Sequence, residues 1–271
     1  PDSAYFHGVT VGRRWVDHVV TDMTGVVRYH EREIHEWPDF DRALDFCRRS
    51  FEQANENATD EQLERVEGYG LAMPFKLWDW AYDLGIDQQK LLPWRDRDFA
   101  KELSEIVNFD VSCQNDATAA CNAELVFGSA ADLPDLFLHL FIGYFIGGGL
   151  VIDRHLFTGP TGNAAAIGSM PIAQPDGSTR QLLELASLHS FSAAVRSSGK
   201  EPDLWTVPVH WVGVEEEVDA WIKQVAPALA QAIATAVSLL DFPTVVIDGH
   251  LPDIVRTRLV EAVRNAMDET D

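Results

Sequence analysis

The chain has 271 residues, of which 46% are apolar, so it is long enough to bury one large core or two medium ones. Its formal net charge is −22 at pH 7 and its basic residues do not cluster, so DNA binding would require a segment outside this sequence. The longest apolar stretch, residues 133–152, is broken by Pro134, Asp135, His139 and four glycines, and no stretch reaches the roughly 18 residues of a membrane span. Without a leader pattern either, the expected location is the cytoplasm and no membrane partner is expected.

The cysteines and histidines do not predict a metal centre. Cys47, Cys113 and Cys121 form no Cys-x-x-Cys pair, and their odd number does not suggest a disulfide framework. We interpret all three as buried, reduced thiols. The nine histidines lack the spacing of a metalloprotease motif.

Strands and helices are predicted to alternate through most of the chain, which favours an α/β fold. The first predicted element is a β-rich hairpin opening over 9–20, which ends at the turn 22–25 and resumes at 26–29. It is followed by a helix over 40–57, a strand over 66–73, a helix over 99–107, a strand over 109–113, and a helix over 117–127. They continue with a strand pair over 136–146 and 149–154 around three glycines, helices over 187–197 and 215–240, a strand over 244–247, a turn at 248–249, and a last helix over 252–267.

Asn115 and Asp116 stand at a predicted strand-to-helix junction. Open α/β sheets bind ligands at the carboxyl ends of their strands, so this pair is a candidate ligand contact. Capping of the following helix by Asp116, with Asn115 in a turn, explains the same residues equally well. The residues alone leave both interpretations open.

The order and spacing of the landmarks resemble the ROK family (repressors, open reading frames and sugar kinases) along nearly the whole chain. The matching landmarks are the opening strand and hairpin with Gly25, the stretches 68–74 and 91–94, the Asn115-Asp116 junction with Glu124 on its helix, the glycines Gly147, Gly148 and Gly149, the loop 159–164, and the stretch 245–249. The resemblance implies a two-domain α/β fold of the actin-like ATPase, ribonuclease H-like type found in sugar kinases. It implies domains over 1–116 and 117–271, with the last helix able to pack back on the first domain, and a homodimer.

The resemblance also implies a sugar site. In the family the Asn-Asp pair contacts a sugar, and in its kinases the Asp is the general base that accepts the proton of the attacking hydroxyl, which would make Asp116 that base here. Further ligand contacts would come from Gly162, Asn163 and Ser169, although a plain β-turn accounts for the loop as well.

Several positions depart from the pattern of the family's kinases. The first-strand motif Asp-x-Gly-Gly-Thr corresponds to residues 10–14, which keep Gly12 but lack the acid. The second phosphate loop reads Gly143-Tyr-Phe145, whose large side chains would crowd amides meant for a nucleotide. With Gly147, Gly148 and Gly149, Gly12 would be a remnant of the nucleotide loops. Ser169 replaces a zinc-ligating His and the Cys-rich cluster is absent, so structural zinc is not expected.

These departures favour a sugar-responsive transcriptional regulator over an enzyme. The chain would be its effector-binding and dimerisation region, with a sugar or polyol as effector and operator DNA contacted through an upstream winged-helix segment. The alternative is an ATP-dependent sugar kinase that uses Asp116 as base and Mg-ATP as cofactor. A pseudokinase scaffold that binds only protein partners is a third possibility.

Overall fold

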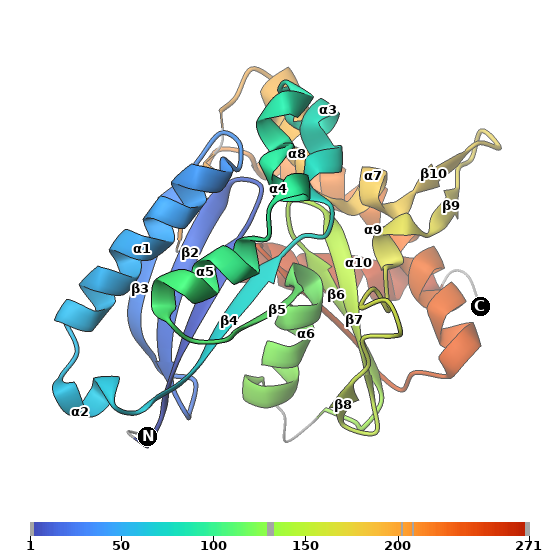
Figure 1. Ribbon diagram of the computed structural model, residues 1–271. Coiled ribbons are helices and arrows are strands. Elements are labelled where there is room, and N and C mark those ends of the chain that lie inside the picture. The colour runs from blue at the N-terminus through green and yellow to red at the C-terminus, as the bar shows by residue number, and fades with distance from the viewer. Residues whose placement is uncertain (1–2, 129–132, 202, 208, 269–271) are drawn as a thin grey trace. The chain divides into compact units, whose positions relative to one another are not determined.

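The structure is a computed structural model that describes residues 3–128, 133–201, 203–207 and 209–268 (Figure 1). Contacts within the chain divide it into two compact units, Pro1–Asp116 and Ala117–Asp271. Both units combine a β-sheet with helices, as the alternating sequence pattern predicts.

The first unit is built on a five-stranded sheet in the order β3-β2-β1-β4-β5. The first three strands form an antiparallel meander, whereas β4 and β5 are added in parallel to β1. Alternate residues of β1 are buried, as expected for a strand with one face against a core. The strands are β1 (Tyr5–Val11), β2 (Trp15–Asp22), β3 (Val27–Ile34), β4 (Val66–Met73) and β5 (Val111–Asn115).

Helix α1 (Phe40–Glu56) covers this sheet together with α5 (Phe99–Val107). α1 begins where Asp39 accepts a hydrogen bond from the Arg42 amide at 2.9 Å, a standard N-cap. Its apolar residues recur every three or four positions and form one core with the sheet and α5. Shorter helical turns complete the unit: α2 (Asp60–Leu63), η1 (Leu77–Trp80), α3 (Ala81–Leu84), η2 (Gln88–Leu91) and α4 (Pro93–Asp96).

The second unit has a four-stranded sheet in the order β11-β6-β7-β8, with β11 parallel to β6 and the other pairs antiparallel. A separate small hairpin joins β9 to β10. The strands are β6 (Phe137–Ile142), β7 (Ile146–Ile152), β8 (His155–Leu156), β9 (Pro171–Ala173), β10 (Thr179–Gln181) and β11 (Val245–Gly249).

The helices of the second unit surround the long helix α9, which packs on α7, α8 and α10. Length and composition alone would allow α9 to cross a membrane, which a count of uninterrupted apolar residues does not reveal. Three glutamates in its first turn complement the helix dipole, and one face of α9 is buried within the unit. The helices are α6 (Asp116–Phe127), η3 (Ile167–Ser169), α7 (Leu182–Ala186), α8 (Leu188–Ser197), α9 (Glu215–Leu240) and α10 (Asp253–Asp268).

The structure corrects three of the sequence-based expectations. The β-rich run over residues 9–20 contains two strands, because the chain reverses at residues 12–14. The three consecutive glycines lie inside β7, while the turn between β6 and β7 is at residues 143–145. Cys113 is exposed, and only Cys47 and Cys121 are buried thiols.

Candidate ligand site at the strand ends and loops

Asn115 and Asp116 are adjacent at the carboxyl end of β5. Asn115 is the last residue of the strand and pairs with Met73 of β4, and Asp116 is the first residue of α6. Both side chains are half-buried. The pair thus occupies the kind of strand end at which α/β sheets bind ligands, while Asp116 also stands in the first turn of a helix, where a carboxylate is favoured.

The turn between β1 and β2 is filled by large side chains. The Trp15 ring lies against Gly12 so closely that a Cβ atom there would be 3.1 Å from it. Arg13 is buried, with its guanidinium carbon 4.9 Å from the centre of the Trp80 ring. The His35 Nε2–H group donates to the Gly12 carbonyl at 3.1 Å, and burial lowers the pKa of His35 to about 4, so the ring is neutral at pH 7.

The turn between β6 and β7 is likewise occupied by its own side chains. Tyr144 and Phe145 are buried and meet edge to face with 4.9 Å between ring centres. The turn is also tied to α8: the His189 amide donates to the Tyr144 carbonyl at 2.9 Å, and the Tyr144 hydroxyl is 2.9 Å from His189 Nδ1. The Ile146 amide donates to the Ser187 hydroxyl at 2.9 Å.

The glycines of β7 have a packing role within the second unit. A Cβ atom at Gly147 would lie 2.6 Å from the Cβ atom of Ala117, and one at Gly149 would overlap Cys121. A Cβ atom at Gly148 would lie 2.7 Å from the Ala165 carbonyl oxygen. Helix α6 can therefore approach the strand only because Gly147 and Gly149 lack side chains, and the loop at Ala165 can do so only because Gly148 does.

Gly162, Asn163 and Ser169 belong to one loop region of the second unit. Gly162 has φ of 71°, the left-handed region that glycine adopts readily, and its amide donates to the Gly159 carbonyl at 3.3 Å in a turn. Asn163 and Ser169 are exposed, and the Ser169 amide donates to the Ala166 carbonyl at 3.1 Å. The structure thus brings these three residues into one loop region and Asn115 with Asp116 into one strand end, each within its own unit.

The two turns that correspond to phosphate loops both carry large side chains. Phosphate is held by free backbone amides in a glycine-lined concavity. Here Trp15 and Arg13 fill one turn, Tyr144 and Phe145 fill the other, and the Ile146 amide is already engaged. Within the described part of the chain, no group of three or more His, Cys, Asp or Glu side chains is arranged to hold a metal ion.

The sequence model of the ROK family matches residues 8–270, and the chain belongs to this family. Among curated proteins, the chain is 25% identical over 182 residues to the xylose repressor of Bacillus subtilis, a match that covers 63% of this chain. The chain spans less than half the length of the first curated relatives it matches, 38% and 43% of theirs.

Solved structures of the family share the fold. A ROK family transcriptional regulator, a homologue of the Escherichia coli MLC protein, superposes with a TM-score of 0.68 at 21% identity, over 98% of this chain and 70% of that one. A ROK family glucokinase from Streptomyces griseus, solved with glucose and AMPPNP, gives the same TM-score at 20% identity, over 98% of this chain and 88% of that one. The fold is therefore the actin-like α/β fold of ROK sugar kinases, which regulators and kinases share.

Proposed function

We propose that this chain is the effector-binding part of a ROK family transcriptional regulator, which recognises a sugar or polyol without phosphorylating it. The observation that carries the proposal is the turn between β6 and β7, where Tyr144 and Phe145 replace small residues and are buried against α8. The sequence similarity to the xylose repressor supports the same assignment. Operator DNA would be contacted through a segment outside this sequence, and the protein would act as a cytoplasmic homodimer.

Asn115 and Asp116 would contact the effector in this proposal. A carboxylate and an amide at a strand end offer several acceptors and a donor, which suits the hydroxyl groups of a sugar. A sensor needs such hydrogen bonds only to hold and orient its ligand. Asn115 and Asp116 could therefore still bind the effector in a protein whose phosphate-binding turns are occupied by large side chains. Asn163 and Ser169 are further candidate contacts, located in the second unit.

A sugar kinase is the second candidate, and the retained Asp116 is the feature that favours it. A carboxylate at this position would accept the proton of the attacking hydroxyl during phosphoryl transfer. That reaction also needs a cradle for the nucleotide phosphates, which the side chains at both turns oppose. We therefore rank the regulator first.

Isothermal titration calorimetry against a panel of sugars and polyols, each with and without Mg-ATP, tests the proposal. We expect one sugar to bind without nucleotide, no effect of Mg-ATP on its affinity, and no ADP. Asp116→Asn should weaken that binding about 10- to 100-fold, the loss expected for a hydrogen bond to a charged group. Asp110→Asn, a substitution at an exposed carboxylate nearby in the sequence, is the matched control and should leave the affinity for the sugar unchanged.

ADP formation that requires the sugar and disappears in Asp116→Asn would instead establish the kinase. Binding of no sugar or polyol by the folded protein would remove both candidates and leave the scaffold interpretation.

A further inference from the structure

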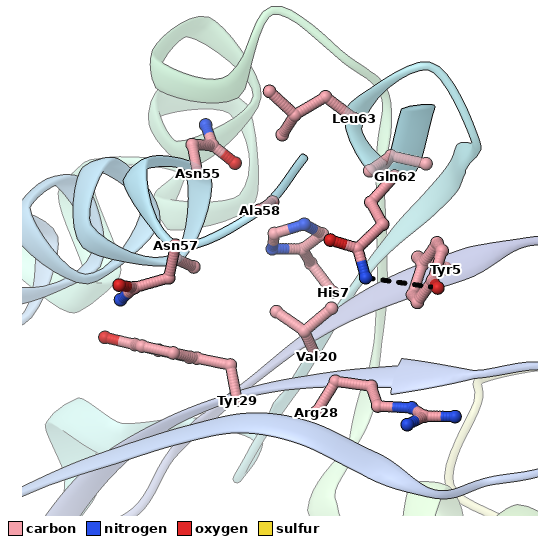
Figure 2. Close-up of a pocket in the computed structure, with 12 residues that line it drawn as sticks. Tyr5, His7, Val20, Arg28, Tyr29, Asn55, Asn57, Ala58, Gln62 and Leu63 are labelled. Carbon is pink, nitrogen blue, oxygen red and sulfur yellow. Dashed lines mark hydrogen bonds between the residues drawn. The ribbon is translucent and has the colours of Figure 1, made fainter. Parts of the chain in front are cut away.

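A cavity of about 90 Å³ lies at the end of the first unit's sheet where β1 and β4 begin (Figure 2). Tyr5 is the first residue of β1 and Val66 the first of β4, whereas Asn115 is the last residue of β5. Because these strands are parallel and β1 has seven residues, the cavity is about 20 Å from the strand end that carries Asn115. It is therefore separate from the candidate sugar contacts.

The floor of the cavity is apolar and contains one buried histidine. Tyr5, Val20 and Ala54 form a small hydrophobic cluster, with Val66 packed against it. His7 is only 4% exposed, and Figure 2 shows its imidazole at the centre of the lining residues. The remaining lining residues are Arg28, Tyr29, Asn55, Asn57, Ala58, Gln62 and Leu63.

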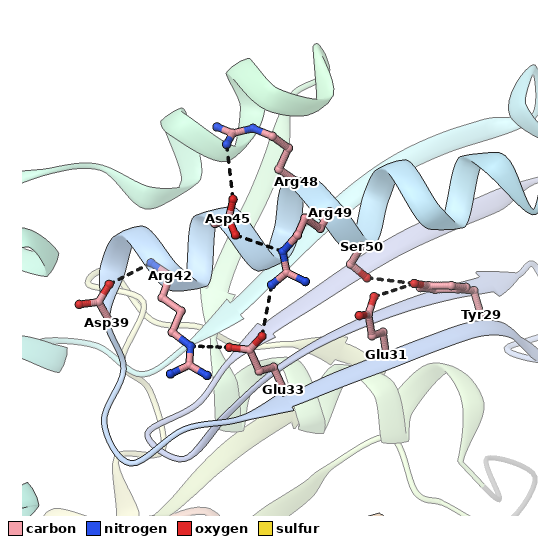
Figure 3. Close-up of polar contacts among 9 residues, drawn as sticks. All are labelled: Tyr29, Glu31, Glu33, Asp39, Arg42, Asp45, Arg48, Arg49 and Ser50. Carbon is pink, nitrogen blue, oxygen red and sulfur yellow. Dashed lines mark hydrogen bonds and ion pairs between the residues drawn. The ribbon is translucent and has the colours of Figure 1, made fainter.

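His7 is the start of a chain of hydrogen bonds that ends at the carboxylate of Glu31. His7 Nδ1 is 2.9 Å from His18 Nε2, and His18 Nδ1 is 2.8 Å from the Ser50 hydroxyl. The Tyr29 hydroxyl lies 3.3 Å from that of Ser50 and donates to Glu31 Oε2 at 2.7 Å. Figure 3 shows this end of the chain, with Tyr29 between Ser50 of α1 and Glu31 of β3.

The carboxylate determines the direction of every bond in this chain. A carboxylate only accepts, so the single Tyr29 proton is used toward Glu31, and the Ser50 hydroxyl must donate to Tyr29. The Ser50 oxygen then accepts from His18 Nδ1–H, which leaves His18 Nε2 as an acceptor. His7 Nδ1 must carry the proton that this acceptor takes. His7 Nε2 is consequently an unprotonated acceptor.

The lining of the cavity has no net charge to offer a ligand. Arg28 is the only cation in it, and its guanidinium makes two hydrogen bonds to Asp22 Oδ2, at 3.0 and 2.6 Å. Burial lowers the pKa of His7 to about 4, so its ring is neutral at pH 7. His7 Nε2 makes no hydrogen bond to any residue that the structure describes, so it is available to a donor on a ligand.

We propose that this cavity is a second ligand site, which takes a small uncharged phenolic compound whose hydroxyl donates to His7 Nε2. The ring would lie on the cluster of Tyr5, Val20 and Ala54. A sugar suits the cavity less well, because it carries hydroxyls on all sides and those that face the apolar floor of Tyr5, Val20 and Ala54 would have no partners. At roughly 10 to 15 Å³ per water-sized group, the volume accommodates about six to nine such groups, which matches a phenol.

Methyl NMR of the whole chain, titrated with phenol and with anisole, tests the proposal. The methyl signals of Val20, Ala54, Ala58 and Val66 should shift with phenol. Phenol should bind about five- to tenfold more tightly than anisole, which has the same ring but no proton to donate. The ¹⁵N signal of His7 Nε2 should be that of an unprotonated nitrogen and should move on phenol binding.

Two variants separate the site from its hydrogen-bond chain. Ala58→Phe places a ring at the cavity wall and should weaken phenol binding more than tenfold. Ser50→Ala removes the group that accepts from His18, which frees the two histidines to change tautomer, and should reduce the preference for phenol over anisole. Equal affinity for the two compounds, shifts confined to other methyl groups, or unchanged binding by Ala58→Phe would each overturn the proposal.

Discussion

A buried histidine in the second unit should destabilise the fold in mild acid. His139 of β6 is fully buried, and neither ring nitrogen makes a hydrogen bond to a residue that the structure describes. Burial is the main cause that lowers the pKa of His139 from 6.5 to about 4. Leucine has a similar size and no nitrogen, so His139→Leu isolates the contribution of the imidazole.

The magnitude follows from proton binding to the unfolded chain. Because the folded-state pKa of His139 is the lower one, its contribution is constant above pH 6.5 and is lost as the pH falls from 6.5 toward 4. Between pH 7 and pH 5 this loss amounts to about 2 kcal/mol of unfolding free energy. His139→Leu should not lose this free energy in acid. It also removes two unpaired buried nitrogens, which should raise the unfolding free energy by about 1 to 3 kcal/mol at every pH.

Urea unfolding at pH 7 and pH 5, followed by tryptophan fluorescence, measures both effects. Trp205, Trp211 and Trp221 belong to the second unit and the other five tryptophans to the first, so the fluorescence follows both units, and the difference between variant and wild type isolates the effect of His139. The chain's large negative charge changes with pH in wild type and variant alike, so it cancels in their difference. His155→Leu, at an exposed histidine of β8, is the control. If the unfolding free energies of His139→Leu and wild type differ by the same amount at pH 7 and pH 5, the reasoning is refuted.

Two further predictions concern packing and thiol access. Gly149→Ala should lower the unfolding free energy by about 1 to 3 kcal/mol in urea titrations, because the new Cβ atom would overlap Cys121 and force α6 away from β7. An unchanged urea midpoint would contradict the close approach of α6 to β7. Ellman's reagent should modify one thiol of the folded protein, the exposed Cys113, and all three in denaturant. Cys47 and Cys121 are fully buried and burial raises the pKa of each to about 12, so rapid labelling of either would contradict the structure.

The long helices are predicted well from sequence because their signals are local, whereas the short helices α2, α3, α4 and α7 have too few residues for a periodic pattern and are not predicted. The spacing of apolar residues in α1, α9 and α10 places each helix to within one residue of its observed ends. The strand β4, bounded by Pro74, was predicted with its exact limits. The ROK resemblance, carried by the order of weak motifs, correctly indicated the family and the fold.

Features that depend on neighbours distant in sequence were not predictable in the same way. β5 begins two residues later than its apolar pattern indicates, and Cys113, which is expected from the sequence to be buried, is exposed. The cavity in the first unit joins residues of β1, β2, β3 and the end of α1. His7, His18 and Ser50 carry no motif in the sequence, and only the packing of α1 on the sheet brings them together.

The glycines of β7 illustrate how far a motif can support a function. Gly147 and Gly149 match the family pattern, yet contacts with Ala117 and Cys121 of α6 already require them. A protein that never binds a nucleotide would need them just as much, so their presence does not distinguish a kinase from a regulator. Tyr144 and Phe145 bear more directly on this choice, because small residues at their turn would leave backbone amides open, and their burial against α8 is the support for the proposed regulator.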